Sequence, residues 1–153
     1  MADHHYVVLN RSQILIYRER VEPGFPPGCV LVASIDFPEA HRGYTDDQSD
    51  MAGRFPAAPR SGGMNIDERL PMQEEAERRN AANLARSLEQ FLKQHPNSRW
   101  DYAAGPTVHY AVLERLSPGV RAGLDRTLQK DLTKTPVIEI ASHFDEAHSH
   151  SRR

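Results

Sequence analysis

Residues 6–17 read YVVLNRSQILIY, and this stretch decides how the fold begins. The runs Tyr6–Leu9 and Gln13–Tyr17 are apolar and rich in β-branched residues, which favours strands, and Asn10-Arg11-Ser12 between them has the composition of a turn. We therefore predict a β-hairpin. Prolines and glycines in residues 18–28 predict a loop, after which the apolar run Cys29–Ile35 continues an antiparallel meander as a third strand.

A long amphipathic helix is predicted in the middle of the chain. Acidic residues at positions 74, 75 and 77 suit the positive end of a helix dipole, and Pro71 suits a first turn, so we expect the helix to begin near Leu70. The helical pattern stops at His95-Pro96-Asn97. The predicted buried face consists of Ala81, Leu84, Ala85, Leu88, Phe91 and Leu92.

The last third of the chain alternates strands and helices. Trp100–Ala104 predicts a strand, and a helix follows Thr107. Leu124–Leu132 is compatible with a strand or a helix, of which we favour a half-exposed strand at an edge. Thr135-Pro136 begins a final helix. The predicted fold class is α/β: a mixed five-stranded sheet, with an antiparallel meander followed by parallel crossovers, and helices on both faces. We expect residues 1–153 to form a single domain whose tail, 146–153, frays.

Composition limits the kinds of partner. The 153-residue chain has a formal net charge of −2, so it has no global attraction to nucleic acid or anionic lipid, and any anion site must be local. The single cysteine, Cys29, borders an apolar run and is expected to be a small buried side chain in a reducing compartment. The sequence shows no signal peptide and no span of membrane length, so we expect a cytoplasmic protein without a membrane partner.

Residues 39–69 lack any periodicity, which predicts a long loop inserted before the helix. Arg54, Arg60 and Arg69 carry donors suited to phosphate. Ser61-Gly62-Gly63 has the backbone freedom to approach RNA closely. Aspartates at positions 46, 47 and 50 repel phosphate and favour the alternative, a flexible surface insertion.

A second basic segment, Lys130–Lys134, precedes the final helix. Lys130 and Lys134 suit an anion-binding edge, whereas Asp131 and Thr133 favour the alternative, a local turn held by side-chain bonds to backbone. The carboxylates have no recognisable metal-binding spacing, and histidines near the two termini are more typical of exposed, frayed segments. We therefore expect no metal and no cofactor.

Several short motifs, taken in order, match a known family. They are Asn10-Arg11-Ser12, Gly53-Arg54, Ser61-Gly62-Gly63, Glu74-Glu75-Ala76-Glu77-Arg78, and Lys130-Asp131-Leu132-Thr133 followed by Pro136 and Glu139. The chain resembles the small bacterial host attachment proteins, relatives of the central domain of archaeal and eukaryotic peptide-chain release factors. The resemblance covers nearly the whole chain.

This resemblance implies a ribonuclease H-like fold, as in several components of the translational machinery, with the long loop leading into the first helix. In release factors the corresponding loop carries Gly-Gly-Gln and promotes hydrolysis of peptidyl-tRNA. Here Met64 follows Gly62-Gly63, and a thioether cannot make the hydrogen bonds of an amide. The family name implies a role in attachment to host cells.

We therefore expect a non-catalytic cytoplasmic binding protein that presents its Gly-Gly loop to the ribosome, tRNA or other RNA, and not to DNA. One alternative is a hydrolase of peptidyl-tRNA or a related ester, and another is an envelope or host-attachment protein. The sequence does not indicate an oligomeric state. The expected RNA-contacting residues are Arg54, Arg60, Ser61, Gly62, Gly63, Arg69, Lys130 and Lys134.

Overall fold

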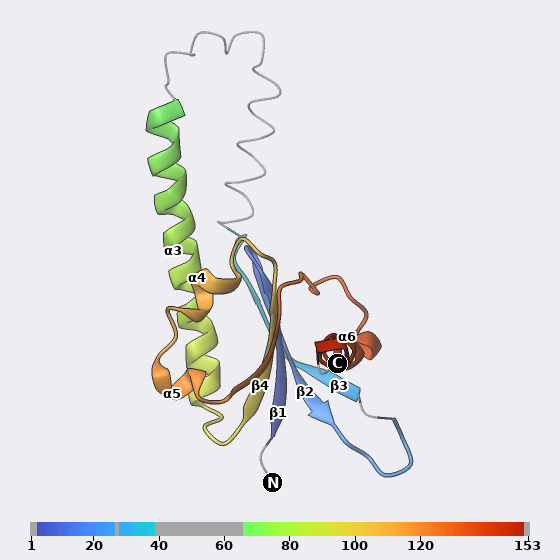
Figure 1. The fold of residues 1–153 in the computed structure, drawn as a ribbon. Coiled ribbons are helices and arrows are strands. Elements are labelled where there is room, and N and C mark those ends of the chain that lie inside the picture. The colour runs from blue at the N-terminus through green and yellow to red at the C-terminus, as the bar shows by residue number, and fades with distance from the viewer. Residues whose placement is uncertain (1–2, 27, 39–65, 152–153) are drawn as a thin grey trace.

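A five-stranded mixed sheet forms the centre of the protein, seen edge-on in the computed structural model (Figure 1). The structure describes residues 3–26, 28–38 and 66–151. The elements are β1 (His4–Asn10), β2 (Gln13–Arg20), β3 (Gly28–Asp36), α3 (Ile66–Lys93), β4 (Arg99–Ala104), α4 (His109–Leu113), α5 (Pro118–Arg121), β5 (Leu124–Leu128) and α6 (Val137–Ser151).

The strand order is β3-β2-β1-β4-β5. β1 and β2 are antiparallel, as are β2 and β3, whereas β4 is parallel to both β1 and β5. The predicted hairpin closes where Asn10 pairs with Gln13, and the Asn10 side-chain oxygen accepts the Ser12 N–H at 2.9 Å. An antiparallel meander followed by parallel crossovers, with β5 at the edge, was predicted from the sequence and is confirmed.

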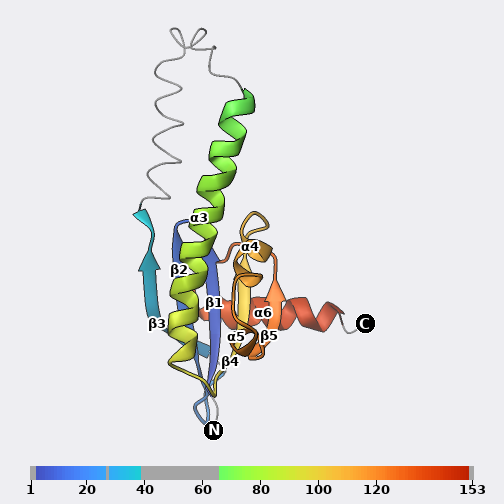
Figure 2. The same ribbon diagram turned by 90° about the vertical axis from the view of Figure 1, so that its left-hand side faces the viewer.

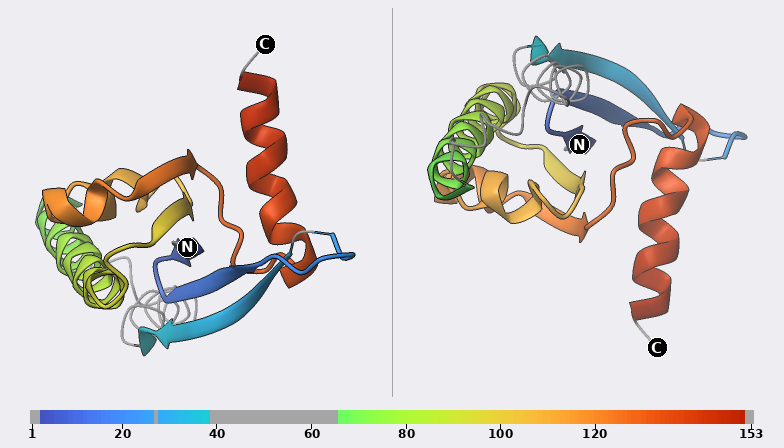
Figure 3. Two further views of the ribbon diagram at one scale, coloured as in Figure 1. Left: turned by 90° about the horizontal axis from the view of Figure 1, so that it is seen from below. Right: turned by 90° about the horizontal axis from the view of Figure 1, so that it is seen from above.

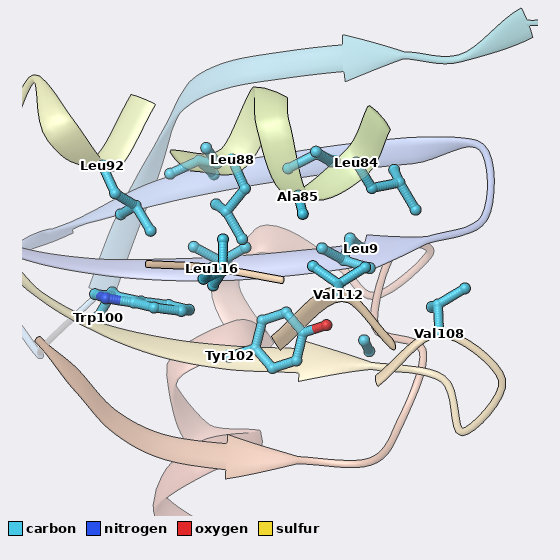
Figure 4. Close-up of a cluster of buried hydrophobic side chains, with 14 of the residues drawn as sticks. Leu9, Leu84, Ala85, Leu88, Leu92, Trp100, Tyr102, Val108, Val112 and Leu116 are labelled. Atoms are coloured by element: carbon cyan, nitrogen blue, oxygen red, sulfur yellow. The ribbon is translucent and has the colours of Figure 1, made fainter. Parts of the chain in front are cut away.

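Helices cover both faces of the sheet, as Figures 2 and 3 show. Successive residues of β1 point to opposite faces, so Val7 and Leu9 join one core while Tyr6 and Val8 join the other. The first core lies beneath α3, α4 and α5 and includes Leu84, Leu88, Trp100, Tyr102 and Val112 (Figure 4). The second lies beneath α6 and includes Tyr17, Cys29, Leu132, Ile140 and Phe144. Cys29 is buried as predicted.

Helix α3 begins at Ile66, so the expected start near Leu70 was wrong, and residues 66–69 are helical rather than part of the loop. Pro71 consequently lies inside the helix, where its ring removes one backbone hydrogen bond. Residues 71–79 are exposed, and this part of the helix projects beyond the sheet (Figure 1). The predicted buried stripe is confirmed from Ala81 to Leu92, except that Phe91 is only partly buried.

Helix α6 starts directly after Thr135-Pro136, as predicted, and buries Ile140, Ala141 and Phe144. Val137 was expected on this face but is 40% exposed. The helix continues to Ser151, so the backbone is helical over 146–151, where fraying was expected. No glycine or proline interrupts residues 137–151, and the backbone therefore has no local reason to leave the helix earlier.

Candidate functional site

The carboxyl ends of the parallel strands β1 and β4 meet at one edge of the sheet, where Leu9 pairs with Ala104. In open α/β sheets this carboxyl edge is where ligands bind. Strand β3 also ends beside this carboxyl edge, because its last residue, Asp36, pairs with Gln13 next to the β1–β2 turn. Helix α3 is tied to the same turn, since the Asn80 side chain donates to the Arg11 carbonyl at 2.9 Å.

A cavity of about 350 Å³ opens on the α3 side of the carboxyl edge, between the β1–β2 turn, α3 and α4. Three arginines reach it from separate parts of the chain: Arg11 from the turn, Arg78 from α3 and Arg115 from the turn that follows α4. Asn80 and Thr107 add neutral polar groups. The three glutamates of the lining are Glu74, Glu77 and Glu114.

Surface ion pairs hold the three arginines. Nitrogen–oxygen distances are 3.7 Å for Arg11–Glu77, 3.3 Å for Arg78–Glu75 and 3.2 Å for Arg115–Glu114. The Arg115 guanidinium also donates to the Ala111 carbonyl at 2.7 Å, which fixes its direction. Exposed pairs of this kind contribute little free energy, so an incoming anion can exchange for a carboxylate at small cost.

The Lys130–Lys134 segment lies at the same edge but on the α6 side, because Leu132 is buried in the α6 core. Asp131 Oδ1 accepts a hydrogen bond from the Thr133 N–H at 2.9 Å. This bond forms the local turn that the sequence offered as the alternative to an anion-binding edge. The Asn10 side chain donates to Thr133 Oγ1 at 3.1 Å and joins this turn to the hairpin. Lys130 and Lys134 are exposed.

Most of the RNA-contacting residues predicted from the sequence lie outside the described residues: Arg54, Arg60, Ser61, Gly62 and Gly63. Arg69 lies in α3, although the structure does not describe its side chain. Of the predicted set, the structure places the side chains of Lys130 and Lys134. The cavity arginines were missed, because no local pattern shows that Arg11, Arg78 and Arg115 converge.

A buried charge network lies near the amino ends of the parallel strands β1 and β4. Asp101 on β4 is 0% exposed and accepts hydrogen bonds from the backbone N–H and the guanidinium of Arg126 on β5. His4 Nε2 lies 3.0 Å from Asp101 Oδ2. Burial opposes ionisation of Asp101, but His4 and Arg126 outweigh it and hold its pKa below the usual value. Burial likewise opposes protonation of His4, but Asp101 raises the His4 pKa.

His4, Asp101 and Asp125 bring their possible ligand atoms within 4.8 Å of one another, which is close enough for one metal ion to contact all three. Arg126 Nη2 lies 2.7 Å from the Asp101 carboxylate, and Arg99 Nη2 lies 3.6 Å from that of Asp125. Two guanidinium groups already neutralise the carboxylates and would repel a cation. The group therefore fits a structural ion-pair network better than a metal site.

His5 and Ser98 form a buried pair, with His5 Nδ1 2.5 Å from Ser98 Oγ. Ser98 Oγ also donates to the Arg99 carbonyl at 3.0 Å. A hydroxyl has one hydrogen, so His5 Nδ1 acts as the donor to Ser98 and does not remove its proton. Burial, with a contribution from the nearby His95, lowers the His5 pKa to about 4. The pair is therefore a structural hydrogen bond and not an activated nucleophile.

The chain is thus a mixed α/β protein with an open five-stranded sheet and an arginine-lined cavity at its carboxyl edge. A family model described as "Protein required for attachment to host cells" matches residues 6–144. The chain belongs to this host attachment family. No curated protein matches its sequence significantly. Within the described ranges, no helix is both long and apolar enough to cross a membrane.

Proposed function

We propose that this protein is a non-catalytic cytoplasmic protein that binds ribosomal RNA or tRNA through the carboxyl edge of its sheet. The observation that carries the proposal is the convergence of Arg11, Arg78 and Arg115 from three elements on one cavity of about 350 Å³. Guanidinium groups present planar pairs of donors that match phosphate oxygens. Because the chain as a whole is slightly acidic, RNA binding requires local donors such as these, and their ion pairs with Glu75, Glu77 and Glu114 must open when phosphate binds.

Neighbouring groups support the same contact. Asn80 and Thr107 line the cavity and suit sugar hydroxyls or base edges, which distinguish RNA from a simple anion. Lys130 and Lys134 are exposed on the other side of the same edge and suit a second backbone contact. The strand order β3-β2-β1-β4-β5 is compatible with the ribonuclease H-like fold that the proposed relationship to release factors implies. Met64 follows Gly62-Gly63 where release factors have glutamine, and its thioether cannot make the hydrogen bonds of an amide side chain, which supports binding without hydrolysis.

The direct test measures tRNA binding as a function of salt concentration. A protein that neutralises phosphates shows a linear fall of log K with log salt, and each lost phosphate contact reduces the slope by roughly 0.7 to 1. We expect Arg115→Gln and Arg11→Gln each to weaken binding and flatten the slope. Arg121→Gln is the matched control, since Arg121 is exposed on α5, away from the cavity.

Two results would contradict RNA binding at this edge. One is the absence of tRNA and ribosomal RNA binding at low salt by the folded protein. The other is an equal loss of affinity in Arg121→Gln, which would mean that the effect follows net charge and not the cavity. In cell extracts, the protein should sediment partly with ribosomes, and Arg115→Gln should shift it to the free fractions.

The family description favours a second candidate, a role in attachment to host cells. This role predicts protein on the cell surface, where protease treatment of intact cells would degrade it. It also predicts that a strain lacking the gene attaches poorly and that Arg115→Gln restores attachment as well as the native protein. Restoration only by the native protein would instead connect attachment to the cavity.

A further inference from the structure

Helix α4 carries an exposed aromatic ring beside the arginine-lined cavity. Tyr110 is 64% exposed. The Glu114 N–H donates to the Tyr110 carbonyl at 2.9 Å, so Tyr110 lies one helical turn before Glu114. Thr107 lies three residues before Tyr110, in the turn that leads into α4, and both Thr107 and Glu114 line the cavity. Residues three and four apart are neighbours on a helix surface, which places Tyr110 at the rim of the cavity.

Buried neighbours support the Tyr110 ring from below. The ring packs against the ring of His109, with centroids 4.9 Å apart and planes at 76°. His109 is buried and packs in turn on Tyr102, at 5.0 Å between centroids. The Tyr102 hydroxyl donates to the His109 carbonyl at 3.0 Å and so ties the start of α4 to β4. The exposed ring therefore stands on a fixed base and loses little conformational entropy when a partner covers it.

The charges beside Tyr110 fit an unpaired nucleotide base. Tyrosine rings stack on the flat faces of unpaired bases, whatever the sequence. The Glu114 carboxylate repels phosphate at this point but can accept hydrogen bonds from amino groups on base edges. Arg115 Nη1 lies 3.2 Å from that carboxylate, so the carboxylate becomes available to a base when Arg115 exchanges it for phosphate. A base at Tyr110 with its phosphate at Arg115 satisfies both charges.

We propose that Tyr110 stacks on an unpaired base while Arg11 and Arg115 hold neighbouring phosphates, so that the cavity selects single-stranded RNA. This inference rests on the RNA binding proposed above and specifies the kind of RNA segment that binds. In a duplex, each base is paired and already stacked on its neighbours, so its face cannot reach the ring. Loops, bulges and ends present free base faces.

A second exposed ring provides a control within the same chain, since single exposed aromatic residues are common on protein surfaces. Phe25 is 67% exposed in the loop between β2 and β3. This loop lies at the end of β2 away from the β1–β2 turn, and thus away from the cavity (Figure 1). Phe25→Ala removes a ring of similar size and exposure without altering the cavity.

Fluorescence anisotropy with a labelled single-stranded oligoribonucleotide tests the stacking. Tyr110→Ala should weaken binding about 5- to 150-fold, the range for loss of one stacked base. Tyr110→Phe keeps the ring and should retain most of the affinity, and Phe25→Ala should bind as the native protein does. Because Tyr110 contacts no phosphate in the proposed complex, Tyr110→Ala should leave the salt slope unchanged, whereas Arg115→Gln flattens it. Circular dichroism and thermal unfolding establish that each variant is folded.

Two further probes separate stacking from RNA binding in general. An abasic strand, which has the ribose-phosphate backbone without bases, should bind the native protein and Tyr110→Ala equally. The duplex of the labelled strand with its complement should likewise show no effect of Tyr110→Ala. Stacking is overturned, and RNA binding is not, if Tyr110→Ala binds the single strand as the native protein does, or if it loses as much affinity for the abasic strand or the duplex. An equal loss in Phe25→Ala has the same meaning. Absence of all RNA binding by the folded native protein overturns both proposals.

Discussion

Asp101 on β4 and Arg126 on β5 are joined by three hydrogen bonds: the backbone N–H, Nε and Nη2 of Arg126 lie 3.0, 3.1 and 2.7 Å from the Asp101 carboxylate oxygens. The register between the two strands shifts between Trp100 and Tyr102, next to this contact. The Asp101 side chain thus accepts a backbone N–H where the regular ladder is interrupted. A buried carboxylate in this way attaches the short edge strand to the sheet.

Replacing Asp101 with asparagine should destabilise the protein by about 3 kcal/mol, at the lower end of the cost of breaking a buried ion pair, because Arg126 is partly exposed. Urea unfolding followed by circular dichroism measures the change. Asp125→Asn is the control, since the Asp125–Arg99 pair is exposed and its loss should cost less than about 1 kcal/mol. Equal effects of the two variants would show that the buried network does not hold β5.

Protein stability should fall as the pH is lowered from 6.5 toward 4. The His5 pKa is about 4 in the folded protein, mainly because of burial, against 6.5 in the unfolded chain. In this window the unfolded chain binds more protons, so His5 contributes a loss of up to about 3 kcal/mol. His109, whose pKa burial also lowers, acts in the same direction, whereas His4, whose pKa Asp101 raises, acts in the opposite direction.

His5→Asn should reduce this pH dependence, because asparagine keeps a donor for Ser98 and does not titrate. Thermal unfolding at a series of pH values checks the expectation. Asp101 does not affect this comparison between pH 6.5 and 4. Its pKa lies below 3.8 in the folded protein, so the stability that its charged form contributes is lost only at lower pH. An unchanged slope in His5→Asn would show that folding does not lower the pKa of His5.

Two glycine-to-alanine substitutions should have opposite effects. A Cβ at Gly123 would lie 3.0 Å from the Ser98 carbonyl oxygen and 3.4 Å from the Trp100 ring, so the backbone must shift at a cost of roughly 1–3 kcal/mol. A Cβ at Gly119, in α5, meets no atom within 4 Å and should be neutral or stabilising by up to about 1 kcal/mol. Fluorescence of Trp100, the single tryptophan, measures both unfolding transitions.

Two isoleucines of α6 separate burial from helix propensity. Ile140 is fully buried beneath the helix, whereas Ile138 is 84% exposed. Ile140→Ala should cost about 2–5 kcal/mol, and Ile138→Ala should stay within about 0.5 kcal/mol. Urea unfolding of the two variants, which share the same substitution in the same helix, makes the comparison. Similar losses would mean that α6 does not dock on the sheet through this face.

Much of the fold was predictable because its signals are local. Alternating and apolar strand patterns identified β1, β2 and β3, and the stripe from Ala81 to Leu92 identified the buried face of α3. Helix ends were less predictable. Pro71 suits a first turn in isolation, but helix α3 continues before it to Ile66, since one missing hydrogen bond does not end a helix. Likewise, no local signal marked Ser151 as the last residue of α6.

The candidate site was less predictable, because its residues are far apart in the chain. Lys130 and Lys134 were identified as a basic segment, and the structure adds that Asp131 and Thr133 form a turn between them. The cavity between the hairpin turn, α3 and α4 exists only when the crossover helix packs beside the turn. No spacing in the sequence connects Arg11 with Arg115.

The sequence alone determined the order and type of the main elements, since periodicity and turn chemistry act over a few residues. The tertiary structure alone decided which distant groups meet. It placed three arginines around one cavity, left Tyr110 exposed beside it, and buried Asp101 against Arg126. The physical reason is that such contacts depend on strand order, register and helix packing, which join segments that local sequence patterns describe separately.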